Sequence, residues 1–274
     1  MKGYFKKSSN DKPVVSVITI VFNGQKYLEH TIQSVLSQSY DNVEYIVIDG
    51  GSTDSTVDII RKYEYAIDYW VSEPDNGISD AFNKGVIAST GGWINFMNCG
   101  DSFASLNVIR IFSENIDEKA DLIFGKGSVA DTQGNVIITT GKVFDEKKFS
   151  RRMTIPHQSA FHHKHYFQQY GIFDRNLKVA MVYDLLLRKK PLSTVFIDSM
   201  FSKMLAGGVH EAEDYLRLRE ARMVKQRYGS NTSRFLIGFD YWYGLTRALI
   251  KRSLICVGLS GITRKIRQME NRLK

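Results

Sequence analysis

The chain has 274 residues, of which 43% are hydrophobic and 24% are charged, the composition of a globular protein with a sizeable core. Such a length fits one large domain, or one domain with an extension. Its two cysteines, Cys99 and Cys256, lie far apart, which excludes a disulfide framework or a cysteine-based metal site and favours a reducing cytosol.

Hydropathy and charge set further expectations. No stretch of about 18 uncharged apolar residues occurs, so no transmembrane helix is predicted. The first residues are not followed by an apolar run, so we expect no signal peptide. Residues 202–274 hold 15 Lys and Arg against 6 Asp and Glu, whereas residues 1–201 are nearly neutral. The net charge of +8 therefore belongs to the C-terminal segment.

The first elements alternate between strand and helix. Residues 14–22 are nearly all apolar and mostly β-branched, which predicts a strand buried on both faces of a parallel sheet. Apolar positions recur at helical spacing over residues 25–38, and residues 44–49 form a second apolar run. A further helix is expected through about residue 64. This βαβα pattern predicts an α/β sheet as the core.

Asp49 stands at the end of the second predicted strand, before a Gly-Gly turn. A carboxylate there can accept hydrogen bonds from a ribose or a base edge. Alternatively, the polar residues at 52–54 simply cap the next helix, and both interpretations can hold together. No Gly-x-Gly-x-x-Gly follows either strand, so the dinucleotide fingerprint is missing and an oxidoreductase is disfavoured.

A polar helix follows the next short strand. Residues 69–71 form that strand, and residues 72–77 form a turn cluster. The helix predicted over 78–89 carries Asp80, Asn83 and Lys84, and its N-terminus should point toward the ligand edge, where helix N-termini favour anions.

The stretch from Trp93 to Asp101 reads as a short buried strand that ends in a glycine turn. In an open α/β sheet, ligands bind outside the carboxyl ends of the strands. Asp101 is therefore placed to hold a hard cation that also grips a substrate phosphate. The alternative is that Asp101 only closes a turn or caps a helix that begins near Ser105.

The second half of the chain mixes helices with antiparallel strands. A helix is expected over 105–115, a strand over 122–125, and a hairpin over 129–142. His157 lies beside a glutamine within an apolar stretch, in a predicted loop or short strand. A lone histidine is more often structural, but at this position it is a candidate site residue.

Together these pieces resemble family 2 glycosyltransferases with the GT-A fold, in the branch that builds bacterial surface polysaccharides. The resemblance spans about residues 14–190, and the motifs follow the order of the family. The matching segments are residues 15–19, 47–54, 73–78, 80–85, 98–101, 156–158, and 171–174 leading into 183–188.

This resemblance implies transfer of a sugar from a UDP-, GDP- or dTDP-linked donor to an acceptor hydroxyl. It implies that Asp101 binds Mg²⁺ or Mn²⁺, although the family's usual partner acid is replaced here by Cys99 and Gly100. By the same resemblance, Asp49 contacts the nucleobase or ribose. The donor would be lined by Asp75, Asp80, Asn83, Lys84 and Gly100.

The chain departs from the family at the expected general base. Inverting members use a carboxylate to deprotonate the acceptor hydroxyl, and the resemblance puts it at position 182. Val182 occupies this position and cannot accept a proton. Either Asp184 takes the role, or Asp184 is structural and pairs with Arg188 four residues later. A helix over residues 183–190 would place Asp184 in its first turn and leave position 182 before it, facing the donor.

The C-terminal segment should form an extension. We expect a GT-A domain over residues 1–200 and a basic amphipathic helical extension over 201–274, including a charged helix over 211–228. Aromatic, aliphatic and basic residues beyond residue 235 favour a helix in a membrane interface, with packing on the core or a dimer contact as alternatives. Nucleic-acid binding is disfavoured because the basic residues sit beside apolar clusters and no binding motif is present.

Two functions remain in view. The first is a metal-dependent, inverting glycosyltransferase that acts on a lipid-linked acceptor at the cytoplasmic face of the cell membrane, in surface polysaccharide synthesis. The second, motivated by Val182, is an impaired or non-catalytic protein of the same fold that binds a nucleotide-sugar.

Overall fold

The computed structural model describes residues 14–131, 133–206, 214–228, 237–239 and 241–246. Short glycine-containing turns separate several of its elements. In chain order, the elements are β1 (Val15–Val21), α1 (Leu28–Leu36), β2 (Val43–Asp49), α2 (Thr56–Lys62), β3 (Tyr69–Ser72), α3 (Ile78–Ala88), β4 (Trp93–Phe96), β5 (Ser102–Phe103), α4 (Val108–Ser113), β6 (Leu122–Ala130), β7 (Val136–Thr140), α5 (Glu146–Arg151), a 3-10 turn η1 (His157–Ser159), β8 (Ala160–His163), α6 (Lys164–Tyr170), α7 (Met181–Leu187), β9 (Thr194–Leu205) and α9 (Asp214–Tyr228).

The strands form one mixed sheet in the order β3-β2-β1-β4-β8-β6-β9-β5, with β7 paired to β6. β1 runs parallel to both β2 and β4, and β2 runs parallel to β3. β8 lies antiparallel between β4 and β6. The expected α/β sheet with antiparallel strands in its second half is confirmed.

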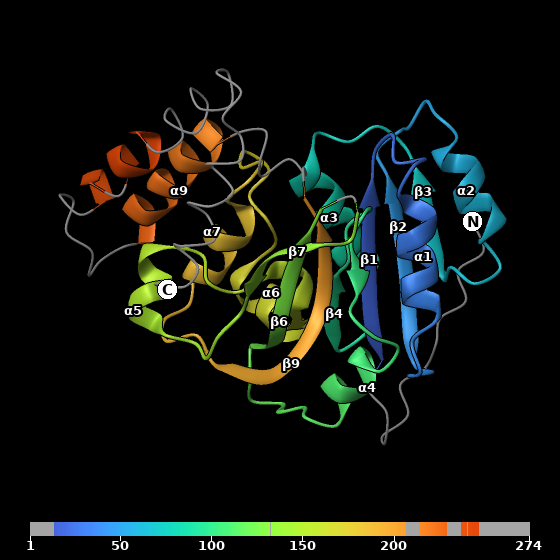
Figure 1. The fold of residues 1–274 in the computed structure, drawn as a ribbon, viewed down its shortest axis with the longest axis horizontal. Coiled ribbons are helices and arrows are strands. Elements are labelled where there is room, and N and C mark those ends of the chain that lie inside the picture. The colour runs from blue at the N-terminus through green and yellow to red at the C-terminus, as the bar shows by residue number, and fades with distance from the viewer. Residues whose placement is uncertain (1–13, 132, 207–213, 229–236, 240, 247–274) are drawn as a thin grey trace.

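Helices cover both faces of the sheet because its central strands are apolar on both sides. Val15 and Val17 of β1 pack in one core with α1, α2 and α4. Ile18 of the same strand packs in the other core with α3, α6 and α7. Figure 1 shows α1 and α2 beside the β1–β3 half of the sheet, and α5, α7 and α9 at the opposite end of the molecule.

Parallel pairing brings the carboxyl ends of β1, β2 and β4 to one edge of the sheet. Val21 of β1 pairs with Asp49 of β2, and Ile18 pairs with Phe96 of β4. The residues that follow these strands therefore emerge side by side. This is the edge at which open α/β sheets bind ligands.

Some boundaries differ from those expected. α7 begins at Met181, so Val182 lies inside the helix rather than before it. β9 continues to Leu205 and pairs with β6 along its length, so the boundary expected after residue 200 falls within a strand. None of the described helices is both long and apolar enough to cross a membrane. Most of the tail beyond residue 235, including residues 247–274, lies outside the described part of the chain.

Candidate active site

Asp101 ends a tight turn after β4. Its amide donates to the carbonyl of Asn98 at 2.9 Å, and Gly100 adopts a φ of +97°, a conformation that favours glycine. The hydroxyl of Thr31, from α1, donates to the carbonyl of Asp101 at 2.8 Å and accepts from the Gly100 amide at 3.0 Å. The turn is thus held to a helix about 70 residues earlier in the chain.

The Asp101 carboxylate is only 7% exposed and is held on both oxygens. Gln158 donates through Nε2 to Oδ2 at 2.8 Å, and the amide of Leu205 donates to Oδ1 at 3.1 Å. Burial raises the pKa of Asp101 to about 7, because these two hydrogen bonds only partly replace lost hydration. A bound cation would favour the ionised form and reverse that shift.

The donor atoms of this turn suit a hard cation that is shared with a ligand. The described residues contain no cluster of three or more His, Cys, Asp or Glu side chains that could hold a metal alone. Burial raises the pKa of the Cys99 thiol to about 12, so Cys99 adds no second anion. The Oδ1 atom of Asn98 is buried without a hydrogen-bond partner among the described residues. Oxygen atoms are the ligands that Mg²⁺ and Mn²⁺ prefer, so Asp101 could hold such a cation together with oxygen atoms of a bound ligand.

Asp49 is fully buried at the end of β2 and organises the turn that follows. Its carboxylate accepts from the amides of Gly51 and Ser52 at 3.2 and 3.0 Å, and from the hydroxyls of Ser52 and Ser72. Gly51 has a φ of +83°, which the turn requires. Asp49 therefore fixes the shape of the edge on which the base or ribose is expected.

Two further side chains flank this turn. The carboxylate of Asp75 accepts from the Gly77 amide at 2.8 Å and lies so close to Gly50 that a Cβ there would be 2.5 Å from Oδ2. Phe22, the residue after β1, is 65% exposed and lies near Gly50 as well. Sequence reasoning assigned Phe22 only to the strand, although an aromatic residue at the carboxyl end of such a strand could have indicated a stacking surface.

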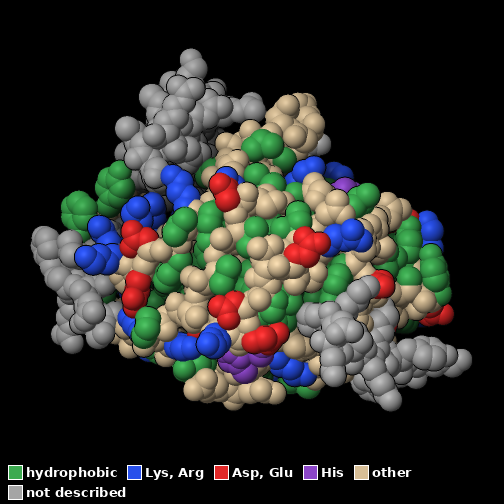
Figure 2. Space-filling view, turned by 90° about the horizontal axis from the view of Figure 1, so that it is seen from below, with side chains coloured by type: hydrophobic (Ala, Val, Ile, Leu, Met, Phe, Trp, Pro, Cys, Tyr) green, Lys and Arg blue, Asp and Glu red, His purple; other side chains and the backbone are tan. Residues whose placement is uncertain are grey.

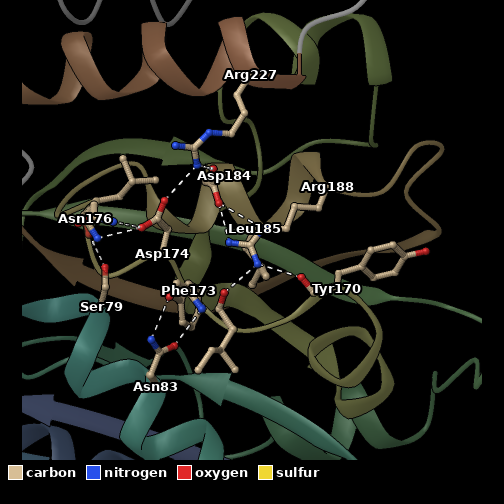
Figure 3. A network of polar contacts seen from close by, with 12 residues as sticks. Ser79, Asn83, Tyr170, Phe173, Asp174, Asn176, Asp184, Leu185, Arg188 and Arg227 are labelled. Carbon is tan, nitrogen blue, oxygen red and sulfur yellow. Dashed lines mark hydrogen bonds and ion pairs between the residues drawn. The ribbon is translucent and has the colours of Figure 1, made fainter.

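The three α3 residues expected at the donor hold neighbouring loops in place. Asp80 accepts from the amide of Asn76 and pairs with Nε of Arg175 at 3.0 Å. Asn83 exchanges two hydrogen bonds of 2.9 Å with the backbone of Phe173. These contacts tie α3 to the segment that leads into α7, and Figure 3 shows the pair formed by Asn83 and Phe173.

Lys84, the third of these residues on α3, contacts the turn that precedes the helix. Its Nζ pairs with Glu73 at 2.8 Å and donates to the carbonyl of Pro74 at 3.1 Å. Lys84 thereby fixes the beginning of the 73–77 turn.

The segment with His157 does reach the site, although Gln158 makes the contact with Asp101. η1 turns the two side chains in different directions. The His157 ring stacks on Phe96 of β4, with centroids 5.0 Å apart, and meets the edge of Phe82 at 5.4 Å. Sequence reasoning selected the histidine because of its chemistry. It missed Gln158 because the contact of Gln158 with Asp101 spans 57 residues, and no local pattern marks it.

Val182 and Asp184 are both buried in α7. Val182 is 7% exposed and lies in the apolar core, and the Asp184 side chain is fully buried. Nη2 of Arg188 donates to Asp184 Oδ2 at 2.7 Å, and Nη1 of Arg227 donates to Oδ1 at 3.0 Å. The expected pairing four residues along the helix is therefore present, together with a second guanidinium from α9 (Figure 3).

α9 is fastened across the start of α7 by a buried carboxylate. Glu220 is 4% exposed and accepts from the backbone amides of Lys178, Val179 and Ala180, at distances of 2.8 to 3.2 Å. Arg227 also bonds Asp174 at 3.0 Å. Sequence reasoning missed these roles, because the contacts span about 40 to 53 residues and no local spacing marks them.

A mixed sheet with buried carboxylates beyond its parallel strands defines an α/β protein with a ligand-binding edge. The model for glycosyl transferase family 2 matches residues 16–194, and the chain belongs to that family. It is 32% identical, over 64% of its length, to an uncharacterised glycosyltransferase of Mycobacterium tuberculosis, of which it covers 68%. It is 26% identical to a PGL/p-HBAD biosynthesis glycosyltransferase of Mycobacterium bovis, over 64% of this chain and 69% of the relative.

Solved structures of glycosyltransferases share the fold. Mannosyltransferase PcManGT from Pyrobaculum calidifontis, in complex with GDP-Man and Mn²⁺, aligns with a TM-score of 0.64 and 12% identity, over 95% of this chain and 84% of that one. TarS of S. aureus, residues 1–349 with UDP-GlcNAc, aligns with a TM-score of 0.60 and 15% identity, over 85% and 72%. The expected family and GT-A fold are confirmed, and the chain is a family 2 glycosyltransferase.

Proposed function

We propose that the edge formed by β1, β2 and β4 binds a nucleotide-diphosphate sugar and that the protein transfers this sugar to a lipid-linked acceptor. The main observation in support of this proposal is the buried Asp101 carboxylate, which Gln158 and Leu205 hold beyond the carboxyl end of β4. The similar folds solved with UDP-GlcNAc and with GDP-Man support a nucleotide-sugar donor.

In this proposal the donor lies along the 22–24, 49–52 and 74–80 turns. Phe22 offers its exposed ring to a nucleobase, since base–aromatic stacking tolerates every base. Asp49 contacts the base or ribose and Asp75 lies beside it. Other proposed donor residues act on the diphosphate-sugar side or hold the turns there, namely Asp80, Asn83, Lys84 and Gly100.

Asp101 is the residue that would hold Mg²⁺ or Mn²⁺. When bound, the cation supplies Lewis-acid stabilisation of the leaving diphosphate. The protein contributes a carboxylate whose position is fixed by Gln158 and whose burial keeps competing water away. Inversion at the anomeric carbon and a role in surface polysaccharide synthesis complete the proposal and follow from the family resemblance.

The acceptor would be met at the inner face of the cell membrane. The described part of the tail presents aromatic side chains to solvent, with Phe239 57%, Trp242 61% and Tyr243 55% exposed. Arg217 and Arg219 on α9 are exposed as well. Amphipathic aromatic rings beside basic residues suit the headgroup region of an anionic bilayer.

Replacement of Asp101 by alanine tests the donor site. We expect Asp101→Ala to abolish the Mn²⁺-dependent part of UDP binding while the protein stays folded, because the carboxylate ends a strand at the edge of the sheet. Calorimetric titration of UDP with and without Mn²⁺ measures this difference. Cys99→Ala, which changes the same turn without removing a charge, is the control. Unchanged metal-dependent affinity in Asp101→Ala would overturn the assignment.

A second candidate is a protein of this fold that binds a nucleotide-sugar without catalysing transfer. It is favoured by Val182 together with the pairing of Asp184 to two guanidiniums, since neither side chain is then ready to deprotonate a hydroxyl. Release of nucleoside diphosphate from a panel of donors with Mg²⁺ or Mn²⁺ separates the two. Binding without release under any acceptor condition would favour this candidate.

A further inference from the structure

The segment that leads into α7 carries few acidic groups, and those present are neutralised. Residues 171–190 contain two acids, Asp174 and Asp184. Both accept hydrogen bonds from Arg227, and Asp184 also pairs with Arg188. Among the described side chains of α9, Glu220 is the carboxylate that reaches this segment, and it already accepts from three backbone amides. These side chains are all committed to holding α7 and α9 together.

This segment lies next to the proposed donor edge. Ser79 of α3 donates through its hydroxyl to the carbonyl of Leu177, and Asp80 pairs with Arg175 at 3.0 Å. Asp80 also accepts from the amide of Asn76, in the turn beside Gly50. A continuous series of contacts therefore runs from the end of β2, through α3, to the residues just before Val182.

Cations on the same segment remain accessible. The Arg175 side chain is 60% exposed and uses only Nε for Asp80. Lys178 is exposed three residues later, just before α7. With its acids paired internally, the surface formed by Arg175 and Lys178, just before α7, favours an anionic group. An arginine fork bonds phosphate oxygens well.

From this pattern, and resting on the proposed transferase function, we propose that the nucleophile of the acceptor is a phosphate monoester. A hydroxyl must lose a proton as it attacks, and this requires a positioned base. A phosphate monoester has a second pKa of about 6 and is mostly a dianion at neutral pH, so it needs no base. Valine at position 182 and a locked Asp184 are then compatible with turnover.

The reaction balances without a proton acceptor. A phosphate oxygen forms a bond to the anomeric carbon of the donor, and the bond from that carbon to the nucleoside diphosphate breaks. The two negative charges of the acceptor become one on the new phosphodiester, and the leaving diphosphate gains one. Transfer to a hydroxyl would instead release one proton for each sugar moved.

The first experiment compares matched acceptors with the full chain and Mn²⁺, across donors that calorimetry shows to bind. Farnesyl phosphate in vesicles, farnesol in the same vesicles and inorganic phosphate are the probes, and nucleoside diphosphate release and product mass are measured. We expect transfer to farnesyl phosphate at least about a hundredfold faster than to farnesol, because the alcohol lacks a base. Transfer to inorganic phosphate as well would show that the phosphate alone is recognised and the lipid is not required.

The outcomes separate this inference from the proposed function. Equal or faster transfer to farnesol would overturn the inference and leave the transferase function standing. Donor binding with transfer to none of the probes would overturn the inference too. If no nucleotide-sugar binds at all, the proposed function fails and the inference fails with it.

Substitutions at position 182 give a test in which the two acceptor types respond in opposite directions. Val182→Asp should slow transfer to farnesyl phosphate by at least about fivefold, because a carboxylate there would repel an anionic acceptor. With farnesol, the same change should increase the rate. Val182→Asn, which is polar but uncharged, separates the charge effect from the cost of placing a polar group in a buried position. A rise with farnesyl phosphate in Val182→Asp would overturn the proposal.

Arg175→Gln tests the proposed cation directly. We expect the KM for farnesyl phosphate to rise about tenfold, as for the loss of one charge-assisted hydrogen bond. The KM for the donor should change less, because Arg175 meets the donor side only through Asp80. Arg61→Gln on α2 is the matched control, since Arg61 is also exposed and also pairs with an aspartate. An Arg175→Gln enzyme whose acceptor KM does not change would remove Arg175 from the proposal.

Discussion

Gln158 shows how one neutral side chain can position a charged one. Its amide donates to Asp101 at 2.8 Å from a buried position. We predict that Gln158→Ala lowers metal-dependent UDP affinity by about 10- to 100-fold, the usual effect of removing a hydrogen bond that orients a metal ligand. Titration of UDP with Mn²⁺ measures it, and Gln168→Ala, at an exposed position on α6, is the control. Equal affinities in the two variants would contradict the prediction.

His162 should make stability depend on pH. The ring is 1% exposed, neither nitrogen has a hydrogen-bond partner among the described residues, and burial lowers the pKa from 6.5 to about 3. Between these values the unfolded chain binds a proton that the folded chain does not. The free energy of unfolding is therefore not reduced by His162 above pH 6.5, and it decreases as the pH falls from 6.5 toward 3.

We expect the titration of His162 to lower the free energy of unfolding by about 2 kcal/mol between pH 7.5 and pH 5. His162→Phe, which suits the surrounding Phe96 and Phe167 rings, should remove that part of the pH dependence. Urea unfolding at the two pH values measures the change, with His30→Phe at an exposed position on α1 as the control. The same pH dependence in wild type and His162→Phe would show that His162 does not titrate between the two states.

At the scale of elements, α9 and α7 behave as one unit. Three backbone amides just before α7, two of them buried, depend on Glu220, and Arg227 joins α9 to Asp174 and Asp184. A charged helix is thus held to the domain by polar contacts as well as by Val224, which is buried in the core. Within the expected extension, α9 therefore packs against the core.

We predict that Glu220→Ala lowers the free energy of unfolding by about 2–4 kcal/mol, because several buried amides lose their acceptor. Chemical denaturation measures the loss, and Gln226→Ala on the exposed side of α9 should cost little. Glu220→Gln should fall between the two, since an amide oxygen accepts fewer of the three bonds. A stability of Glu220→Ala equal to that of Gln226→Ala would contradict the role given to Glu220.

At the scale of the whole molecule, basic and apolar groups share one end. Figure 2 shows Lys and Arg side chains next to hydrophobic ones at the left of the molecule, where Figure 1 draws α5 and α9. The described tail residues pack on α9, with Tyr241 beneath the guanidinium of Arg222 at 4.9 Å and Gly244 against Leu218. Packing on α9 and binding a membrane are therefore compatible.

We predict that Phe239→Ala combined with Trp242→Ala weakens binding to anionic vesicles and leaves binding of UDP unchanged, because both rings are more than half exposed. Co-sedimentation with vesicles that contain an anionic lipid measures it. Tyr65→Ala, at an 83% exposed aromatic on the far half of the sheet, is the control. If the double variant sediments as fully as the control, these rings do not face the membrane.

The sequence alone predicted the strands of the parallel half of the sheet, their alternation with helices and the edge at which a ligand is expected, but it did not predict β9. This was possible because β-branched runs, helical spacing and glycine turns are local patterns. The same patterns placed Asp49 and Asp101 at the ends of their strands. The motifs also carried the family resemblance, which the match over residues 16–194 confirms.

The tertiary structure decided which side chains are free to act. Asp101 takes its partners from Gln158 and Leu205, 57 and 104 residues away, and Asp184 takes its second guanidinium from a helix 43 residues later. No local spacing encodes such contacts, because they depend on how the helices pack across the sheet. Whether a carboxylate can take up a proton or a cation depends on those contacts, since burial and partners set its charge.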